Sequence, residues 1–350
     1  MSASIGLMLF YGIIETLVIL LPVLLSVAFI TIIERKILAS VQRRVGPNSV
    51  GYYGVLQPFA DALKLITKET VQPAQSSIGL FYLAPCISLI FSLLNWGVIP
   101  FGPGFTICDY EISVLYTLAL SSVGIYGVLL AGWSANSSFA FIGSLRSTAQ
   151  IVSYELIIGS VVLTVIVISG SFNYTEIVES QENIWFVIPL VPLFIIWLIS
   201  ILAETNRTPF DLVEAESELV SGFFTEHSAT VFVLFFLAEY SSIVIMSTLT
   251  SLLFLGGYNI PEIFVNNSIF SFTSVVLAIK TCFIAFFFVW IRATLPRVKF
   301  NTLITFCWTQ ILPLAIALVL LVPSILVAFD ITPLFLIITI IFIITSRLFI

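Results

Sequence analysis

Acidic residues gather in one short segment of the chain. The segment 203–226, AETNRTPFDLVEAESELVSGFFTE, holds six of the nineteen Asp and Glu residues and a single basic residue. If its middle is helical, Asp211, Glu214 and Glu218 share one face at spacings of three and four. Glu216 then points elsewhere. Like charges so placed repel, so in a partly buried site some of these carboxyl groups would hold a proton near neutral pH, and the cluster could relay protons.

Two other interpretations of this acidic segment remain open. It could be a solvated loop, or a patch that docks a basic partner subunit. Large hydrophobic residues alternate with the acids, which argues against free solvation; they are Phe210, Leu212, Val213, Leu219, Val220, Phe223 and Phe224.

Three ionisable residues stand inside long apolar runs. Glu155, Glu239 and Lys280 lie well within such runs, where a charge is costly and is by default a functional candidate that faces the protein interior. The alternative is structural pairing, for example between Glu239 and Lys280. Together with the acidic segment, these residues would give a proton path from one membrane surface toward the middle of the bilayer.

The elements that must position these charges are membrane helices. The chain has 350 residues, of which 59% are hydrophobic and 9% charged, and its apolar residues come in runs of about the length that crosses a bilayer. Unbroken apolar runs without alternation exclude a transmembrane barrel, so we predict an all-α, polytopic integral membrane protein with one domain over residues 1–350. A net charge of −6 and the absence of a basic patch argue against nucleic-acid binding. Four scattered cysteines and one histidine predict no metal site.

We predict about nine transmembrane helices from the apolar runs. Their ranges are 8–33, 78–100, 112–134, 150–169, 184–203, 229–255, 269–291, 303–328 and 332–349. The ninth has Pro333 near its start, so it could instead lie along the side of the bundle.

The basic residues give the orientation. Eleven of the thirteen Lys and Arg residues fall in alternate connections, on one side of the membrane. They are Arg35, Lys36, Arg43, Arg44, Lys64, Lys68, Arg146, Arg207, Arg292, Arg297 and Lys299. The positive-inside rule makes this the cytoplasmic or matrix side and places the N-terminus outside. The two long connections, 34–77 and 203–230, both lie on this inner side.

The first long connection contains an amphipathic segment, GVLQPFADALKLITKE. Its apolar residues recur at helical spacing, with polar residues largely opposite and Pro58 in the first turn, which predicts a helix in the membrane interface. Such a helix could be a packing strut. It could also leave a lateral opening through which a lipid-soluble molecule enters from the bilayer.

The stretch before this helix, ERKILASVQRRVGPN, follows directly after the first apolar run. Glu34 and Arg35 stand at the membrane boundary, where we expect two opposite charges to be held together. Arg44 is expected to anchor the chain at the surface, and Gly46 and Pro47 supply a turn.

These segments together resemble membrane subunit 1 (H-type) of respiratory complex I, the proton-pumping NADH:ubiquinone oxidoreductase. The resemblance covers almost the whole chain. It includes the motifs ERKILASVQRRVGPN and GVLQPFADALKLITKE of the first long connection, 34–77, which we name loop one. It also includes SYE at 153–155, AETNRTPFDLVEAESELVSGF at 203–223, AEY at 238–240 and IRATLPR at 291–297. In its abundance of Phe and Ile, and in the segment GFFTEHSA, the chain is most similar to fungal mitochondrial versions.

The resemblance implies a function. The subunit would form the ubiquinone access chamber with two peripheral-arm subunits and pass the effect of quinone reduction to antiporter-like membrane subunits. It would carry no redox centre: ubiquinone is the substrate, and FMN and iron–sulfur clusters belong to partner subunits. The expected surroundings are phospholipids of the mitochondrial inner membrane, with a bacterial plasma membrane as the alternative.

The resemblance also assigns residues. Along the quinone passage it places Arg35, Asp61 and Arg292. To proton coupling it assigns Glu155, Glu204, Asp211, Glu214, Glu216, Glu218, Glu239 and Lys280. Structural residues of loop one are Glu34, Arg44, Gly46, Pro47 and Lys64. The chain departs from many relatives at His227, where they have Tyr, and at Asn301, where they have Asp.

Two other classes of protein compete with this interpretation. A secondary ion transporter that works alone predicts internal repeats with interrupted helices at matching positions, and the chain shows no convincing repeat. A purely structural anchor for a soluble enzyme explains the basic inner loops but not Glu155, Glu239 and Lys280.

Overall fold

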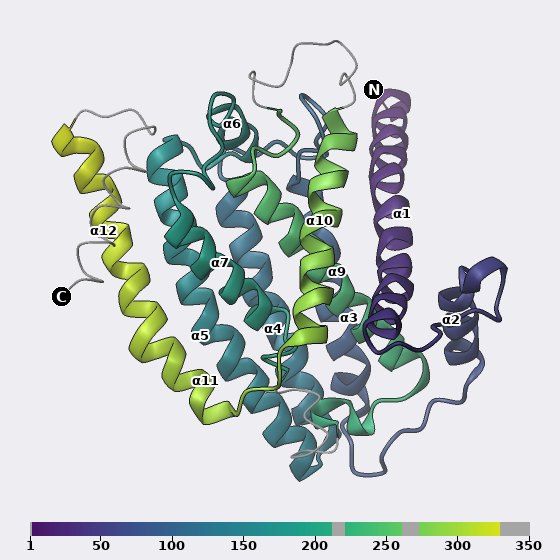
Figure 1. The fold of residues 1–350 in the computed structure, drawn as a ribbon. Helices are drawn as coiled ribbons and strands as arrows, with labels where there is room; N and C mark the ends of the chain where they lie inside the picture. Colours follow the sequence, from purple (N-terminus) through teal and green to yellow (C-terminus); the bar gives the residue numbers. More distant parts are fainter. Residues whose placement is uncertain (1, 212–220, 261–272, 330–350) are drawn as a thin grey trace.

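The computed structural model describes residues 2–211, 221–260 and 273–329, with side chains from residue 12 onward, and all regular elements in these ranges are helices (Figure 1). The long ones are α1 (Ser2–Val41), α3 (Ile78–Leu94), α4 (Ser113–Ala135), α5 (Ser138–Ser169), α9 (Ala229–Phe254), α10 (Thr273–Thr294) and α12 (Leu312–Phe329). Shorter helices are α2 (Gln57–Thr67), α6 (Tyr174–Glu179), α7 (Val191–Glu204) and α11 (Phe300–Phe306). Single turns are η1 (Tyr52–Gly54), η2 (Asn95–Val98), η3 (Gly222–Glu226) and η6 (Cys307–Ile311).

Seven helices of the described ranges are long and apolar enough to cross a membrane, which confirms the all-helical membrane fold. They match seven of the nine predicted spans. The predicted span 184–203 is instead the shorter helix α7, because Pro189 and Pro192 delay the start of the helix to Val191. The predicted ninth span, 332–349, lies outside the described residues.

Two helices extend further than predicted. Helix α1 continues to Val41 and α5 begins at Ser138, so Glu34, Arg35 and Arg146 lie on helices and not in connections. The apolar run of α1 ends before Glu34, but good helix formers such as Lys, Leu and Ala follow, and the first strong breaker is the Gly46–Pro47 pair.

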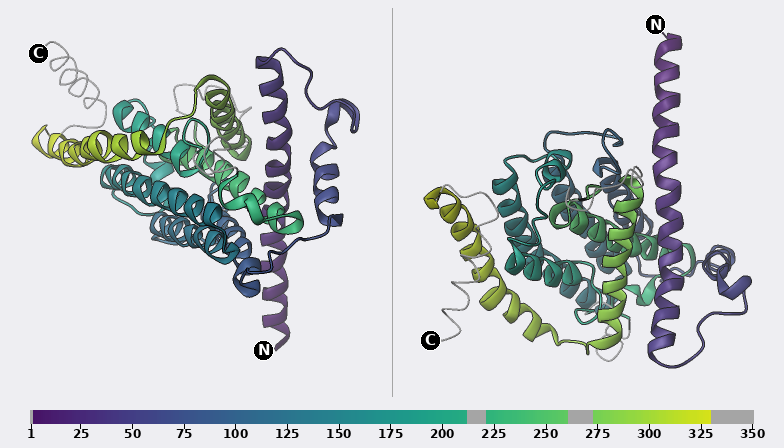
Figure 2. Two further views of the ribbon diagram at one scale, coloured as in Figure 1. Left: turned by 90° about the horizontal axis from the view of Figure 1, so that it is seen from below. Right: turned by 45° about the horizontal axis from the view of Figure 1, so that its top comes forward.

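Helix α9 is the centre of the packing. It contacts α1, α3, α6 and α10, while α5 packs against α4, α7 and α12. Helix α1 stands at the edge of the bundle, with α2 on its far side (Figures 1 and 2). The ends of α1, α3 and α10 that adjoin the basic connections lie in the lower half of Figure 1, which is the predicted inner side.

Helix α2 confirms the helix predicted in the first long connection. Pro58 occupies its first turn, and none of its residues is buried within this chain. The apolar side chains of Phe59, Leu63 and Ile66 are exposed. They therefore remain available to lipid, to a partner subunit or to an apolar ligand.

Candidate functional site

A buried carboxylate ties four segments together at the inner end of the bundle. The Glu34 side chain on α1 accepts hydrogen bonds from Arg207 Nη1 at 3.1 Å, from Tyr240 Oη at 2.7 Å and from Arg292. Glu34 is only 4% exposed. Its partners come from the loop after α7, from α9 and from α10, so one charge fixes the relative positions of four parts of the chain.

Tyr240 stabilises Arg207 as well as Glu34. The Arg207 guanidinium lies over the Tyr240 ring, 4.4 Å from its centroid. A carboxylate taken out of water needs this number of charge-assisted hydrogen bonds to offset its desolvation. We name Glu34, Arg207, Tyr240 and Arg292 the Glu34 cluster.

The structure corrects the expected pairing of Glu34 with Arg35. Neighbouring residues on a helix point about 100° apart, and Arg35 turns away from the bundle toward α2. There its Nη1 binds Asp61 Oδ2 at 2.7 Å, and Gln57 Nε2 binds the other Asp61 oxygen at 2.9 Å. This pair is half-exposed, with 50% and 36% of the Arg35 and Asp61 side chains accessible. Arg292 lies in the Glu34 cluster, apart from this pair.

The beginning of the acidic segment is folded back onto the bundle. The Gln150 amide on α5 donates to the carbonyls of Ala203 and Phe210, at 2.7 and 2.9 Å, and so closes the turn between them. Asp211, at the end of this turn, is buried and lies 3.4 Å from Arg297 Nη2. Asp211 therefore has a cationic partner, and the helical face proposed for it with Glu214 falls on residues outside the described ranges.

The other acids of that segment, Glu214, Glu216 and Glu218, also lie outside the described residues. What the structure does place is Glu204, the last residue of α7. Its Oε2 atom is buried and, within the described ranges, has no hydrogen-bond partner.

Glu204 lines a cavity of about 130 Å³ between α3, α4 and α9. Glu239 on α9 lines the same cavity, so two of the predicted coupling acids are brought together here. Other polar lining residues are Ser88, Ser92, Asn95, Ser121, Thr205, Asn206 and Ser242. A cavity of this volume with these polar groups on its wall has room for several water molecules.

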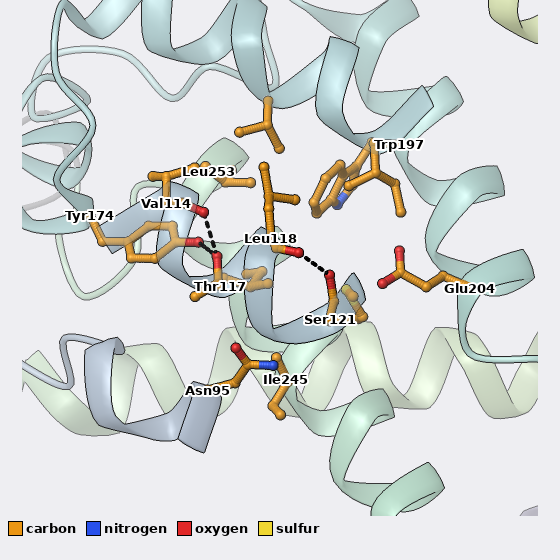
Figure 3. A pocket seen from close by; sticks show the side chains of 14 residues that line it. Asn95, Val114, Thr117, Leu118, Ser121, Tyr174, Trp197, Glu204, Ile245 and Leu253 are labelled. Carbon is orange, nitrogen blue, oxygen red and sulfur yellow. Dashed lines mark hydrogen bonds between the residues drawn. The ribbon is translucent and has the colours of Figure 1, made fainter. Parts of the chain in front are cut away.

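A second, smaller cavity of about 20 Å³ adjoins the first and shares Glu204, Asn95 and Ser121 with it. Figure 3 shows the Glu204 carboxyl group directed toward Ser121, and the hydroxyl groups of Thr117 and Tyr174, 2.6 Å apart, further along. Asn95 Oδ1, like Glu204 Oε2, is a buried acceptor without a partner among the described residues. The volume is enough for one water molecule.

Glu155 on α5 joins this polar region through Ser121. The Ser121 Oγ atom lies 3.4 Å from Glu155 Oε1. Two of the predicted coupling acids, Glu204 and Glu239, therefore line the larger cavity together with Ser121, and a third, Glu155, is joined to this region by its contact with Ser121.

Lys280 is not part of that group. Its ammonium donates to the backbone carbonyls of Leu255, Gly257 and Asn259. An ammonium has three donors, so the backbone of this turn uses all of them and Glu239 receives none.

Of the predicted structural residues of loop one, Arg44, Gly46 and Pro47 lie in the turn after α1, whereas Glu34 lies on α1 and Lys64 on α2. Gly54 has φ +74°, and a Cβ there would collide with the carbonyl of Pro47. Gly46 packs closely on the end of α1. Arg44 and Lys64 are exposed. The turn thus depends on backbone geometry, whereas the two basic side chains can reach the surroundings.

His227 stands in an aromatic pocket beside the acidic segment. The centroid of its ring lies 4.4 Å from the ring centroid of Phe81 and 5.3 Å from the ring centroid of Phe235. Neither ring nitrogen forms a hydrogen bond of normal geometry in the described part of the chain. Burial lowers the pKa of His227 from 6.5 to about 4, and the backbone of Ala131 opposes this only in part.

A His227→Phe variant is expected to be less sensitive to acid. Between pH 6.5 and 4 the unfolded state binds a proton at His227 and the folded state does not, so folding loses up to about 3 kcal/mol from this group as the pH falls. Phenylalanine keeps the aromatic packing and removes the proton site. Thermal unfolding of both proteins at pH 7.5 and 5 should show a smaller drop for the variant. Equal drops would contradict the buried, neutral imidazole.

Sequence reasoning missed three polar residues of the site. Tyr240 follows Glu239 in the AEY motif, but nothing in the sequence showed that it points to Glu34. Asn95 and Ser121 are short polar residues in apolar helices, a weak signal that gains meaning only when both face a cavity with Glu204. In the described residues no group of three or more His, Cys, Asp or Glu side chains could hold a metal ion.

Comparisons with known proteins identify the family of this chain. The family model described as NADH dehydrogenase matches residues 14–323. A protein named NADH-ubiquinone oxidoreductase chain 1 in Mycosarcoma maydis is 62% identical over 325 residues, which cover 92% of this chain and 98% of that protein. The protein of the same name in Podospora anserina is 52% identical over 92% of this chain and 97% of its own length.

A bacterial protein is also similar to this chain over most of its length. A subunit of the NADH-quinone oxidoreductase of Rhodospirillum centenum is 49% identical over 91% of this chain and 95% of its own length. Identities at this level across nearly the full length of each chain show common descent, and the chain belongs to the NADH dehydrogenase family.

Proposed function

We propose that this chain forms the access chamber for ubiquinone in proton-translocating NADH:ubiquinone oxidoreductase and couples quinone reduction to proton movement. Membership of the family makes it a subunit of that enzyme, and the names of its relatives support ubiquinone or a related quinone as substrate. The observation that carries the proposal is the acid-lined cavity of about 130 Å³, which contains Glu204 and Glu239.

The proposed quinone passage lies between α1 and α2. Arg35 and Asp61 offer a polar, half-exposed pair, and Phe59 exposes an apolar ring on the same helix as Asp61. A quinone needs both kinds of surface: hydrogen-bonding groups for its head and apolar side chains for its isoprenoid tail. Arg292 contributes by holding Glu34, and thereby α1, against α9 and α10.

The proposed coupling begins in the acidic segment and continues into the cavities. Reduction of a quinone changes the charge in the chamber, and the field of that charge would alter which carboxyl groups of the chain hold protons. Asp211, Glu214, Glu216 and Glu218 would respond first, and Glu204, Glu155 and Glu239 would follow along the cavity.

The electron carriers of the reaction, FMN and iron–sulfur clusters, would lie on peripheral-arm subunits, and antiporter-like membrane subunits would receive the protonation signal. We place the assembly in the mitochondrial inner membrane, with phospholipids around the exposed apolar faces. The fungal relatives support this localisation.

Photo-crosslinking of the assembled complex tests the chamber. A quinone analogue with a photoreactive head group should label residues within 34–70 or 203–230, and excess ubiquinone should suppress the labelling. An Asp61→Asn variant should lose labelling near α2, whereas Glu176→Gln, which changes an exposed side chain on α6 at the opposite end of the bundle, should not. Labelling confined to other subunits would contradict the proposal.

A further inference from the structure

Three backbone carbonyl groups converge on one cation at the end of α9 opposite the Glu34 cluster. Lys280 Nζ lies 2.6 Å from the oxygen of Leu255, 2.8 Å from that of Gly257 and 2.7 Å from that of Asn259. The Trp185 ring covers a further side, with its centroid 4.6 Å from the ammonium nitrogen. Carbonyl oxygens and the face of an indole ring are groups that attract a compact cation.

The turn that carries these carbonyls is held by contacts that do not involve Lys280. The Gly256 amide donates to Gln181 Oε1 at 3.0 Å, and the Gly257 amide donates to the Ser251 carbonyl at 2.8 Å. Both glycines have positive φ, +69° and +51°, which an ordinary residue adopts only with strain. The carbonyl arrangement is therefore built into the backbone of the turn and is expected to persist without the lysine side chain.

We propose that the turn from Leu255 to Asn259, together with Trp185, is a binding site for an ammonium-type monovalent cation, and that Lys280 fills this site from within the chain. The lysine then acts as a fixed cation. Each of its three protons is bound to a carbonyl oxygen. A carbonyl does not take up a proton near neutral pH, so none of these three partners accepts one from the ammonium.

This inference changes the path proposed for protons. Glu155, Glu204 and Glu239 stay in the relay, whereas Lys280 becomes a positioning residue that fastens α10 to the end of α9. The carbonyl site itself does not depend on quinone binding, so it can fail or hold independently of the proposed function.

Chemical rescue tests the site. A Lys280→Ala substitution in the assembled complex removes the atoms of a propylammonium ion, and we expect the midpoint of thermal unfolding to fall by several degrees. Added propylammonium should restore most of the loss, and the same concentration of neutral propanol should not. Lys299→Ala is the matched control, because Lys299 is exposed; its midpoint should respond to neither compound.

Two further measurements keep the test decisive. If Lys280→Ala fails to assemble, Lys280→Gln retains donors without charge and should show a smaller loss that propylammonium does not repair. The assembled Lys280 variant is also measured in reconstituted vesicles without added amine. Its ratio of protons moved to electrons transferred should equal that of the unmodified complex. A lowered ratio at unchanged thermal stability, or rescue no better than in Lys299→Ala, would overturn the proposal; loss of quinone crosslinking alone would leave it standing.

Discussion

Replacing Glu34 by Gln is expected to lower the free energy of unfolding by about 3–5 kcal/mol, the cost of removing one partner from a buried ion pair. The side chain is almost fully buried, and Arg207 and Arg292 both depend on it. Without the carboxylate, two like charges remain close together with a neutral amide between them. The change should separate α1 from α9 and α10 at their inner ends and reduce the amount of assembled complex.

The neighbouring residue supplies the control for this prediction. Arg35→Gln breaks a half-exposed ion pair with Asp61, and such pairs contribute only about 0–1 kcal/mol. The two variants differ by one position on the same helix, so thermal unfolding of the complex and its yield on native gels compare them directly. A double variant, Glu34→Gln with Arg292→Gln, should recover part of the loss, because one unpaired charge is removed. Equal stability of the two single variants would refute the importance of the Glu34 cluster.

Replacing Glu204 by Gln is expected to lower coupled NADH:quinone turnover by on the order of a hundredfold or more, the scale on which a positioned proton-transfer group contributes. The substitution keeps the shape of the side chain. Because Oε2 has no hydrogen-bond partner in the described residues, the amide breaks no existing contact there. The stability of the complex should therefore stay the same while proton transfer through the cavity stops.

This prediction needs three readouts on one preparation. The rate with an uncoupler, the proton-to-electron ratio in vesicles and the midpoint of thermal unfolding together separate a coupling defect from a folding defect. Glu176→Gln, an exposed carboxyl group on α6, serves as control and should leave all three unchanged. A Glu204→Gln complex with normal turnover and a normal ratio would exclude this carboxyl group from the relay.

The sequence by itself determined the fold class and the direction of most helices. Apolar runs of membrane-spanning length leave the backbone no partner but itself, so the long runs in the described part of the chain form helices. The amphipathic pattern around Pro58 was enough to predict α2, because it depends on residues a few positions apart. The clustering of basic residues in alternate connections also predicts the orientation in the membrane, without reference to any contact between helices.

Helix ends were less certain from the sequence. The apolar run of α1 ends before Glu34, but the helix continues for two more turns because nothing in residues 34–41 breaks it. Conversely, Pro189 and Pro192 shorten α7 although the surrounding residues are apolar. Hydropathy reports where a chain enters lipid, whereas local backbone preferences decide where the helix begins and ends.

Only the tertiary structure decided which charges meet. The partners of Glu34 lie 173, 206 and 258 positions away, and its sequence neighbour Arg35 faces a different helix. The same holds for Lys280, whose charge suggested a partner in Glu239 but which binds the carbonyls of a turn. Side-chain type and spacing determine what a residue can do in a membrane; its actual partner depends on the direction in which its helix turns it and on which other helix packs against that face.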